Sequence, residues 1–169
     1  MWKIAVFLTI ALMLLGANLS WCLAAQSEAP PVWATKLAQK HEHPKFPRAA
    51  DLLAVMRVES FYKPGVVNGE ARGVMQVSGG SLDPDQNVQQ GAKILSDLYQ
   101  KFRSEKKALM VYNIGIGNYL DGNLLERGED YARLVLTKRS ALNSRRQTAA
   151  RTWWASSRFP SRLGHFCPG

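Results

Sequence analysis

The sequence predicts a mainly α-helical protein with one small domain. Apolar residues recur at helical spacing in several stretches between Phe46 and Val135, and no stretch shows the apolar-polar alternation of a useful β-strand. Removal of an N-terminal targeting segment would leave about 140 residues, enough to bury one core and too few for two. We therefore expect a helical domain over residues 47–142, with further segments on either side.

The N-terminus has the pattern of a secretory signal peptide over residues 1–25. Lys3 precedes an unbroken apolar run from Ile4 to Leu15, and small residues end the segment at Leu23-Ala24-Ala25. The protein is therefore expected to be exported to the periplasm or cell envelope. An uncleaved membrane anchor is the alternative, because the run approaches the about 20 residues that span a bilayer. Lipid attachment is disfavoured because bulky Trp21 precedes Cys22.

The segment 26–46 is interpreted as a polar linker. It contains His41 and His43 beside Glu42, but no third and fourth ligands follow at a spacing typical of metal sites. No glycine-rich phosphate loop or Ser-His-Asp order stands out either. We predict no metal and no cofactor.

A helix is predicted between Phe46 and Tyr62, and it carries the most informative residue. Its apolar stripe, continued by one turn, falls on Glu59 and Ser60. Pro47 suits the first turn, and Pro64 with Gly65 prevents continuation, so Glu59 lies near the C-terminal end.

Two effects should raise the pKa of Glu59. The apolar face would desolvate the carboxylate, and the C-terminal end of the helix dipole is negative. A carboxyl group with a raised pKa can act as a general acid near neutral pH. The alternative is that Glu59 faces solvent or pairs with Arg57, Lys63 or Arg72.

Three further helices are expected downstream. The first would be capped by Asn87 and run to about Phe102, with Ile94, Leu95 and neighbouring apolar residues on its core face. The second would start near Glu105 and end at the Gly115 loop.

The last helix is predicted from its first turn and its inner face. Glu129 and Asp130 suit the first turn, and Leu134, Val135 and Tyr131 would face inward.

Four short blocks occur in a particular order. They are Glu59-Ser60-Phe61-Tyr62, then Gly73-Val74-Met75-Gln76, then Asp83-Pro84 with Asn87 and Gly91, and then Tyr112-Asn113-Ile114-Gly115. This series resembles the lytic transglycosylase family, the soluble type with a goose-lysozyme-like SLT domain. The resemblance covers about Ala50 to Leu136 and implies a lysozyme-like helical domain with a substrate groove.

The resemblance implies roles for particular residues. Glu59 would be the sole catalytic acid and base, and Tyr112 would approach it. The expected substrate-binding residues are Ser60, Met75, Gln76, Tyr112, Asn113 and Tyr131, of which Tyr131 matches less specifically. Tyr112 as an ordinary core aromatic residue is the alternative.

The implied reaction is cleavage of the β-1,4 bond between N-acetylmuramic acid and N-acetylglucosamine in peptidoglycan, giving 1,6-anhydromuramyl ends. One glutamate is enough when the acceptor is the substrate's own C6 hydroxyl. Lysozyme-type hydrolysis is the alternative and would need a second carboxylate, for which Glu70, Asp83 and Asp85 are candidates. Asp83 and Asp85 are more simply interpreted as turn and helix-start residues.

The sequence departs from the family pattern in two places. The segment Val77 to Leu82, between the Met-Gln and Asp-Pro blocks, is shorter than usual, and Val111 stands where alanine is usual. A second class of function therefore stays open, in which the chain is a non-catalytic wall-binding subunit of an envelope-spanning machine.

Charge is distributed unevenly along the chain. Residues 26–130 hold thirteen basic and thirteen acidic residues, whereas 131–169 hold eight basic and no acidic ones. The apolar residues from Asn143 onward show no helical or strand period, so 143–169 is expected to be a poorly ordered basic tail. Peptidoglycan glycan strands are the expected partner of the domain. For the tail we expect an anionic surface or secretion or conjugation machinery as its partner, and the alternative is a solvated tail with no partner. Nucleic acid is not expected, and the protein is expected to be a monomer.

Overall fold

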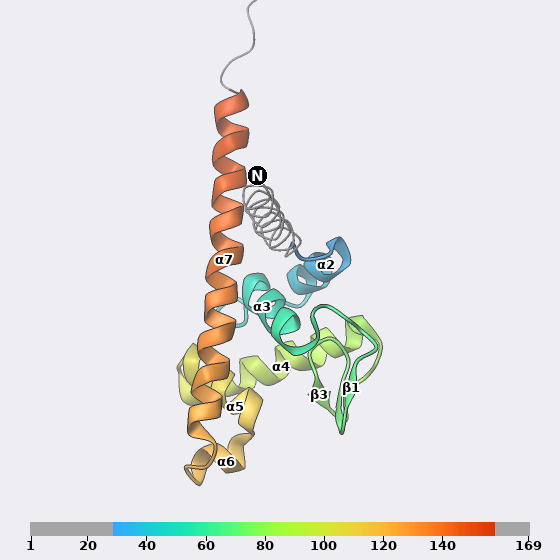
Figure 1. Ribbon diagram of the computed structural model, residues 1–169, viewed down its shortest axis with the longest axis vertical. Helices are drawn as coiled ribbons and strands as arrows, with labels where there is room; N and C mark the ends of the chain where they lie inside the picture. Colours follow the sequence, from blue (N-terminus) through green and yellow to red (C-terminus); the bar gives the residue numbers. More distant parts are fainter. Residues whose placement is uncertain (1–28, 158–169) are drawn as a thin grey trace, which may run out of the picture. The chain divides into compact units, whose positions relative to one another are not determined.

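The computed structural model describes residues 29–157 of the chain (Figure 1). The chain divides into two units, Met1–Pro31 and Val32–Gly169, and every element below belongs to the second. The expected signal peptide and the end of the basic tail, 158–169, lie outside the described residues. Within the described part, no helix is both long and apolar enough to cross a membrane.

The prediction of a mainly α-helical fold is confirmed. The helices are α2 (Val32–Lys40), α3 (Ala49–Ser60), α4 (Pro84–Phe102), α5 (Glu105–Ile114), α6 (Ile116–Leu120) and α7 (Leu125–Ser157). Between α3 and α4 lie three two-residue strands, β1 (Val67–Asn68), β2 (Ala71–Arg72) and β3 (Val77–Ser78). They pair antiparallel in the order β1-β2-β3.

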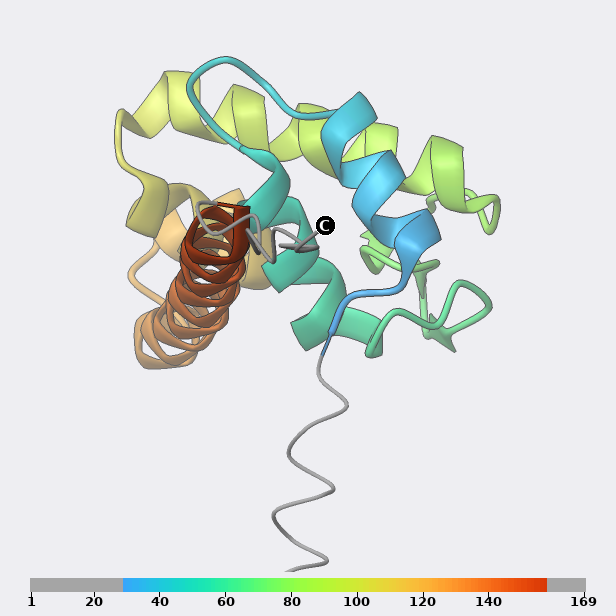
Figure 2. The same cartoon turned by 90° about the horizontal axis from the view of Figure 1, so that it is seen from above.

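The core is built around α3. This helix packs against α7 on one side and α2 on the other, while α5 packs against both α4 and α7 (Figure 2). The buried side chains at these contacts are mostly aliphatic, and the largest include Leu52, Met56, Leu95, Leu109 and Val135. Burying each such side chain contributes about 1.5–3 kcal/mol.

Helix α3 begins two residues later than its proline suggested. Pro47 precedes the N-cap residue Arg48 and does not lie in the first turn. The Arg48 backbone N–H donates to the side chain of Asp51, which caps the helix at 2.9 Å. The helix ends at Ser60, as expected from Pro64 and Gly65, with Phe61 in the left-handed conformation.

Helix α4 begins at Pro84, and the expectation that Asn87 caps it is wrong. Asp83 is the N-cap, and its side chain accepts from the Gln86 backbone N–H at 2.9 Å. Proline at the first helical position needs no N–H partner, which favours this earlier start. Ile94, expected in the core, is exposed.

The interpretation of 26–46 as a linker is wrong for residues 32–40, which are half of its described part. Residues 32–40 form α2, which buries Ala34 and Ala38 against the domain. These residues are one turn apart, so a short apolar stripe was present in the sequence. Phe46 is also buried, with its ring 5.5 Å from that of Tyr99.

Helix α7 starts at Leu125, earlier than expected, and continues to Ser157. The prediction of irregular structure is therefore wrong for residues 143–157. From Glu129 to Ser157 the sequence has no glycine or proline to stop a helix. Tyr131 and Val135 face inward as expected, but Leu134 is exposed.

Candidate active site

Glu59 is the penultimate residue of α3 and is half-buried. The Tyr131 hydroxyl, from α7, donates a hydrogen bond to Glu59 Oε1 at 2.6 Å. The contact joins residues 72 positions apart in the sequence. It exists because α3 and α7 pack side by side through the core.

Burial raises the pKa of Glu59 above its usual value. Two weaker effects oppose this shift, the hydrogen bond from Tyr131 and the positive charge of Arg127. A phenol is neutral, so Tyr131 orients the carboxyl group without the strong stabilisation of its anion that a bonded cation would give. Glu59 is therefore suited to hold and donate a proton.

Tyr112 interacts electrostatically with both members of this pair. Burial and the negative charge of Glu59 both raise the pKa of Tyr112, and the same two causes raise the pKa of Tyr131. Both phenols are therefore neutral donors at physiological pH. The expectation that Tyr112 approaches Glu59 agrees with this electrostatic interaction, but the Tyr112 hydroxyl donates to the Met75 carbonyl at 2.8 Å.

Three other predicted site residues are directed toward the protein. Ser60 is buried, and its hydroxyl contacts the carbonyls of Met56 and Val74. Met75 is 0% exposed, so its side chain packs in the core and does not line a groove. The Gln76 amide donates to the carbonyls of Val66 and Gly73 at 3.0 and 2.7 Å.

Asn113 follows Tyr112 on α5 and is partly buried. Its Oδ1 atom is buried, and no hydrogen-bond donor reaches it among the described residues. Buried amide oxygens are nearly always bonded to protein or water. Asn113 therefore has unused capacity as an acceptor.

The carboxylates considered for hydrolysis are engaged elsewhere. Glu70, in the turn between β1 and β2, accepts from the Ser78 hydroxyl at 3.2 Å. Asp83 caps α4, and Asp85 in its first turn pairs with Lys40 and His41. The expectation that Asp83 and Asp85 are helix-start residues is confirmed.

Two features near the site were not predicted from the sequence. One is the residue Arg127, and the other is the set of hydrogen bonds made by the Asn87 side chain. Arg127 lies in the first turn of α7. An earlier start for this helix would have placed Arg127 one turn before Tyr131, on the same face. Asn87 was interpreted as a cap, whereas its side chain bonds the segment around Met75.

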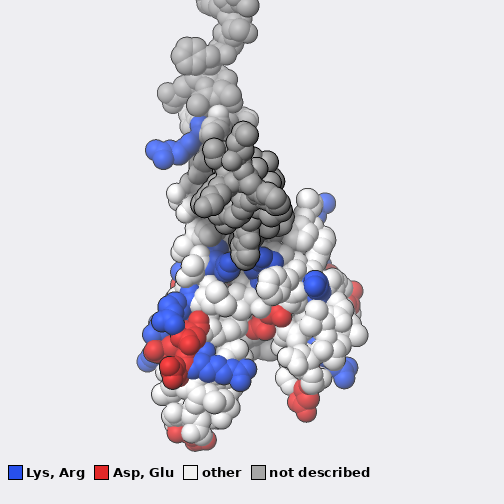
Figure 3. Space-filling model, in the orientation of Figure 1, with Lys and Arg blue, Asp and Glu red and all other residues white. Residues whose placement is uncertain are grey.

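The surface around this region is hollowed. Figure 3 shows a depression between the part that carries β1 to β3 and the part that carries α5 and α6. Helix α3 ends between these two parts (Figure 1).

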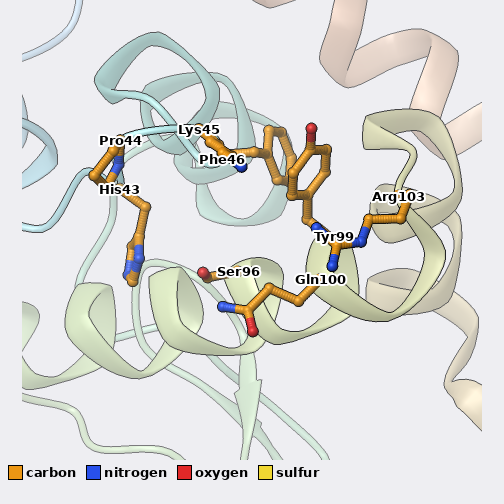
Figure 4. A pocket seen from close by; sticks show the side chains of 8 residues that line it. All are labelled: His43, Pro44, Lys45, Phe46, Ser96, Tyr99, Gln100 and Arg103. Carbon is orange, nitrogen blue, oxygen red and sulfur yellow. The ribbon is translucent and has the colours of Figure 1, made fainter.

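A separate pocket contains none of the predicted site residues. Figure 4 shows it between the segment before α3 and one side of α4. It is lined by His43, Pro44, Lys45, Phe46, Ser96, Tyr99, Gln100 and Arg103.

The histidine segment is held by protein contacts. His41 pairs with Asp85, and Glu42 accepts from the Ala49 backbone N–H. Among residues 29–157, no three His, Cys, Asp or Glu side chains are grouped as a metal site would require.

Residues 78–133 match the family model of the transglycosylase SLT domain. The resemblance to the lytic transglycosylase family is confirmed. The matched SLT segment includes α4, α5 and Tyr131 but begins after Glu59. A role for Glu59 therefore rests on its surroundings in the structure and not on this match.

Two solved structures share the fold. The 70-kDa soluble lytic transglycosylase of Escherichia coli is 22% identical with a TM-score of 0.56, over 65% of this chain and 24% of that one. A complex of the 70-kDa soluble lytic transglycosylase with bulgecin A is 21% identical with a TM-score of 0.58, over 68% and 24%. The chain thus spans about a quarter of the length of these transglycosylases. No curated protein matches it.

Proposed function

We propose that this chain is an exported peptidoglycan lytic transglycosylase with Glu59 as its single acid and base. The observation that carries the proposal is the Glu59 carboxyl group itself. It has a raised pKa, its bonded partner is a neutral phenol, and a second phenol lies beside it. The SLT match gives the family in which such a carboxyl group has a function.

The reaction needs two proton transfers at one carboxyl group. Protonated Glu59 gives its proton to the glycosidic oxygen as the bond from that oxygen to the muramyl C1 breaks. The resulting carboxylate takes the proton of the muramyl C6 hydroxyl as its oxygen bonds to C1. Glu59 returns to its protonated form, and the products are an N-acetylglucosamine end and a 1,6-anhydromuramyl end.

The surroundings of Glu59 favour this reaction over hydrolysis. The hydrogen-bond partner of the Glu59 carboxyl group is the phenol of Tyr131 and not a second carboxyl group. A hydrolase would place a base or nucleophilic carboxylate within about 5–10 Å of the acid. Glu70, Asp83 and Asp85 all have other contacts in the structure.

Mass spectrometry of digested peptidoglycan tests the proposal. Residues 26–169 are incubated with purified sacculi, with Glu59→Gln in parallel, and the soluble products are analysed. Anhydromuramyl ends that disappear in the variant support the proposal. Reducing muramyl ends would indicate hydrolysis, and sacculus binding without product from either protein would indicate the wall-binding subunit.

Bulgecin A gives a second test of the same site. It binds the related 70-kDa transglycosylase. We expect it to inhibit product release from this chain and to bind the Glu59→Gln variant as well. If the inactive variant still binds bulgecin A, its loss of activity comes from the missing carboxyl group and not from a disrupted binding site.

Export is part of the proposal, because the substrate lies outside the cytoplasmic membrane. It is tested by fractionating cells that express the full chain and sequencing the N-terminus of the mature protein. Cleavage after Ala24 or Ala25 would support the signal peptide. An intact N-terminus in the membrane fraction would indicate an anchor.

We also propose that residues 143–169 bind an anionic partner. In the described part of this segment, Arg145, Arg146 and Arg151 are exposed on α7. A variant that ends at Leu142 should still digest sacculi but no longer sediment with anionic lipid vesicles. Equal sedimentation of both proteins would exclude a lipid partner.

A further inference from the structure

Asn87 lies one turn into α4 and is 0% exposed. Its side-chain amide uses its full complement of donors. Oδ1 accepts from the Met75 backbone N–H at 2.7 Å, and Nδ2 donates to the carbonyls of Arg72 and Ser81, each at 2.9 Å. One side chain thus fixes both ends and the middle of the segment 72–81.

The segment is shaped to receive this side chain. Gly73 has a φ of +77°, and a Cβ atom there would lie 2.4 Å from the Asn87 Cγ. A Cβ on Gly91, one turn further along α4, would lie 2.7 Å from the Met75 Cε. Only glycine allows these close approaches without displacement of the segment.

Three helices meet at Met75. The peptide group between Val74 and Met75 accepts from the Ser60 hydroxyl of α3 at its carbonyl and donates to Asn87 of α4 at its N–H. The next carbonyl, that of Met75, accepts from the Tyr112 hydroxyl of α5 at 2.8 Å. Ser60 is adjacent to Glu59 in the chain, and the charge of Glu59 acts on Tyr112.

We propose that Asn87 is a positioning residue for the catalytic site. It contacts neither the substrate nor Glu59. It holds the Met75 backbone in the place where the Met75 carbonyl fixes the Tyr112 phenol and the Val74 carbonyl fixes Ser60. This role rests on the proposed function, in which the geometry around Glu59 determines turnover.

Asn87→Ala should lower kcat by on the order of 10–100-fold and leave KM within about threefold, because small displacements of catalytic groups cost rate more than binding. Asn87→Asp keeps the acceptor for the Met75 N–H but places a carboxylate against the carbonyls of Arg72 and Ser81. Protonation would restore one donor. The kcat of Asn87→Asp relative to wild type should therefore recover as the pH falls.

Two comparisons separate positioning from mere stability. Leu95→Ala, in the core on the same helix, should lower the melting temperature without changing kcat of the folded protein. In a Tyr112→Phe background, which lacks the hydroxyl, Asn87→Ala should lower kcat less than in wild type. Equal losses in both backgrounds would contradict transmission through Tyr112.

The ¹³Cζ resonance of labelled Tyr112 measures the positioning without turnover. It should shift in Asn87→Ala and Asn87→Asp and stay in place in Leu95→Ala. An unchanged resonance in both Asn87 variants would overturn the inference. If wild type releases no product, the proposed function fails, while this resonance still decides whether Asn87 positions Tyr112.

Discussion

Helix α3 carries a buried carboxyl group near its start, Asp51, and a half-buried one near its end, Glu59, and the two have different bonding partners. Asp51 is 2% exposed and bonds to the guanidinium of Arg139 and the Arg48 backbone N–H, each at 2.9 Å. Glu59 bonds to the neutral hydroxyl of Tyr131. Burial raises the pKa of both carboxyl groups and is the largest effect on each.

The two carboxyl groups differ in the interactions that oppose the effect of burial on the pKa. At Asp51 an ion pair, a backbone donor and the positive end of the helix dipole all favour the anion. At Glu59 the phenol of Tyr131 and the charge of Arg127 oppose the effect of burial, whereas the negative end of the helix dipole adds to it. Both carboxyl groups therefore gain affinity for a proton, but only Asp51 also bonds a cation, the Arg139 guanidinium that ties α3 to α7.

Glu59→Gln should give the largest effect and acts on activity. An amide cannot donate and then accept a proton, so release of anhydromuramyl products should fall by on the order of 10²–10⁴-fold. Product formation is measured by mass spectrometry and folding by circular dichroism. A folded variant with more than a tenth of wild-type turnover would rule out Glu59 as the acid.

Asp51→Ala should act on stability instead. It leaves Arg139, which is one-quarter exposed, without its buried partner and should lower the free energy of unfolding by about 3 kcal/mol. Turnover of the folded fraction should be unchanged. Unfolding is followed in urea, with activity assayed below the transition.

Glu105→Ala is the matched control for this pair. Glu105 accepts from the same guanidinium at 2.7 Å but is more exposed, so its loss should cost about 1 kcal/mol or less. A larger loss from Glu105→Ala than from Asp51→Ala would show that burial is not what distinguishes the two contacts.

The sequence predicted the place of Glu59 near the end of its helix, because that place depends on local patterns. The apolar stripe placed it inward, and Pro64 with Gly65 placed the helix end. Helix α5 was predicted for the same kind of reason, and Ser104 caps it immediately before Glu105. Such features depend on residues within one or two turns.

The contacts of the site could not be predicted in this way. The partner of Glu59 lies on α7, and the contact of Tyr112 with the Met75 carbonyl spans 37 positions. Asn87 shows the limit most clearly. Its residue type suits a cap, and its tertiary role depends on Gly73 leaving space beneath it.

Tyr131→Phe should have a smaller effect and tests the phenol. Tyr131 lowers the pKa of Glu59 by donating to it, so its removal should raise that pKa further. The loss of activity on the alkaline side should move to higher pH, because Glu59 stays protonated for longer. Loss of the orienting hydrogen bond should also lower kcat about tenfold at neutral pH. A shift of the profile to lower pH would contradict the assignment.

The smallest expected effect is a gain in stability from Glu59→Gln. Because burial raises the folded-state pKa of Glu59 above its ordinary value of 4.5, the folded protein binds its proton more tightly than the unfolded chain. Wild-type stability should therefore fall as the pH rises from about 4.5 through the raised pKa. The variant does not titrate there, so it should be more stable at neutral pH, by about 1 kcal/mol or less, and show no gain at acid pH.

Thermal unfolding of both proteins across pH measures this difference. Because the penalty comes from burial, added salt should change it little. A variant that is less stable than wild type at every pH would mean that the Glu59 carboxylate supports the fold, as Asp51 does. The two ends of α3 would then share one role.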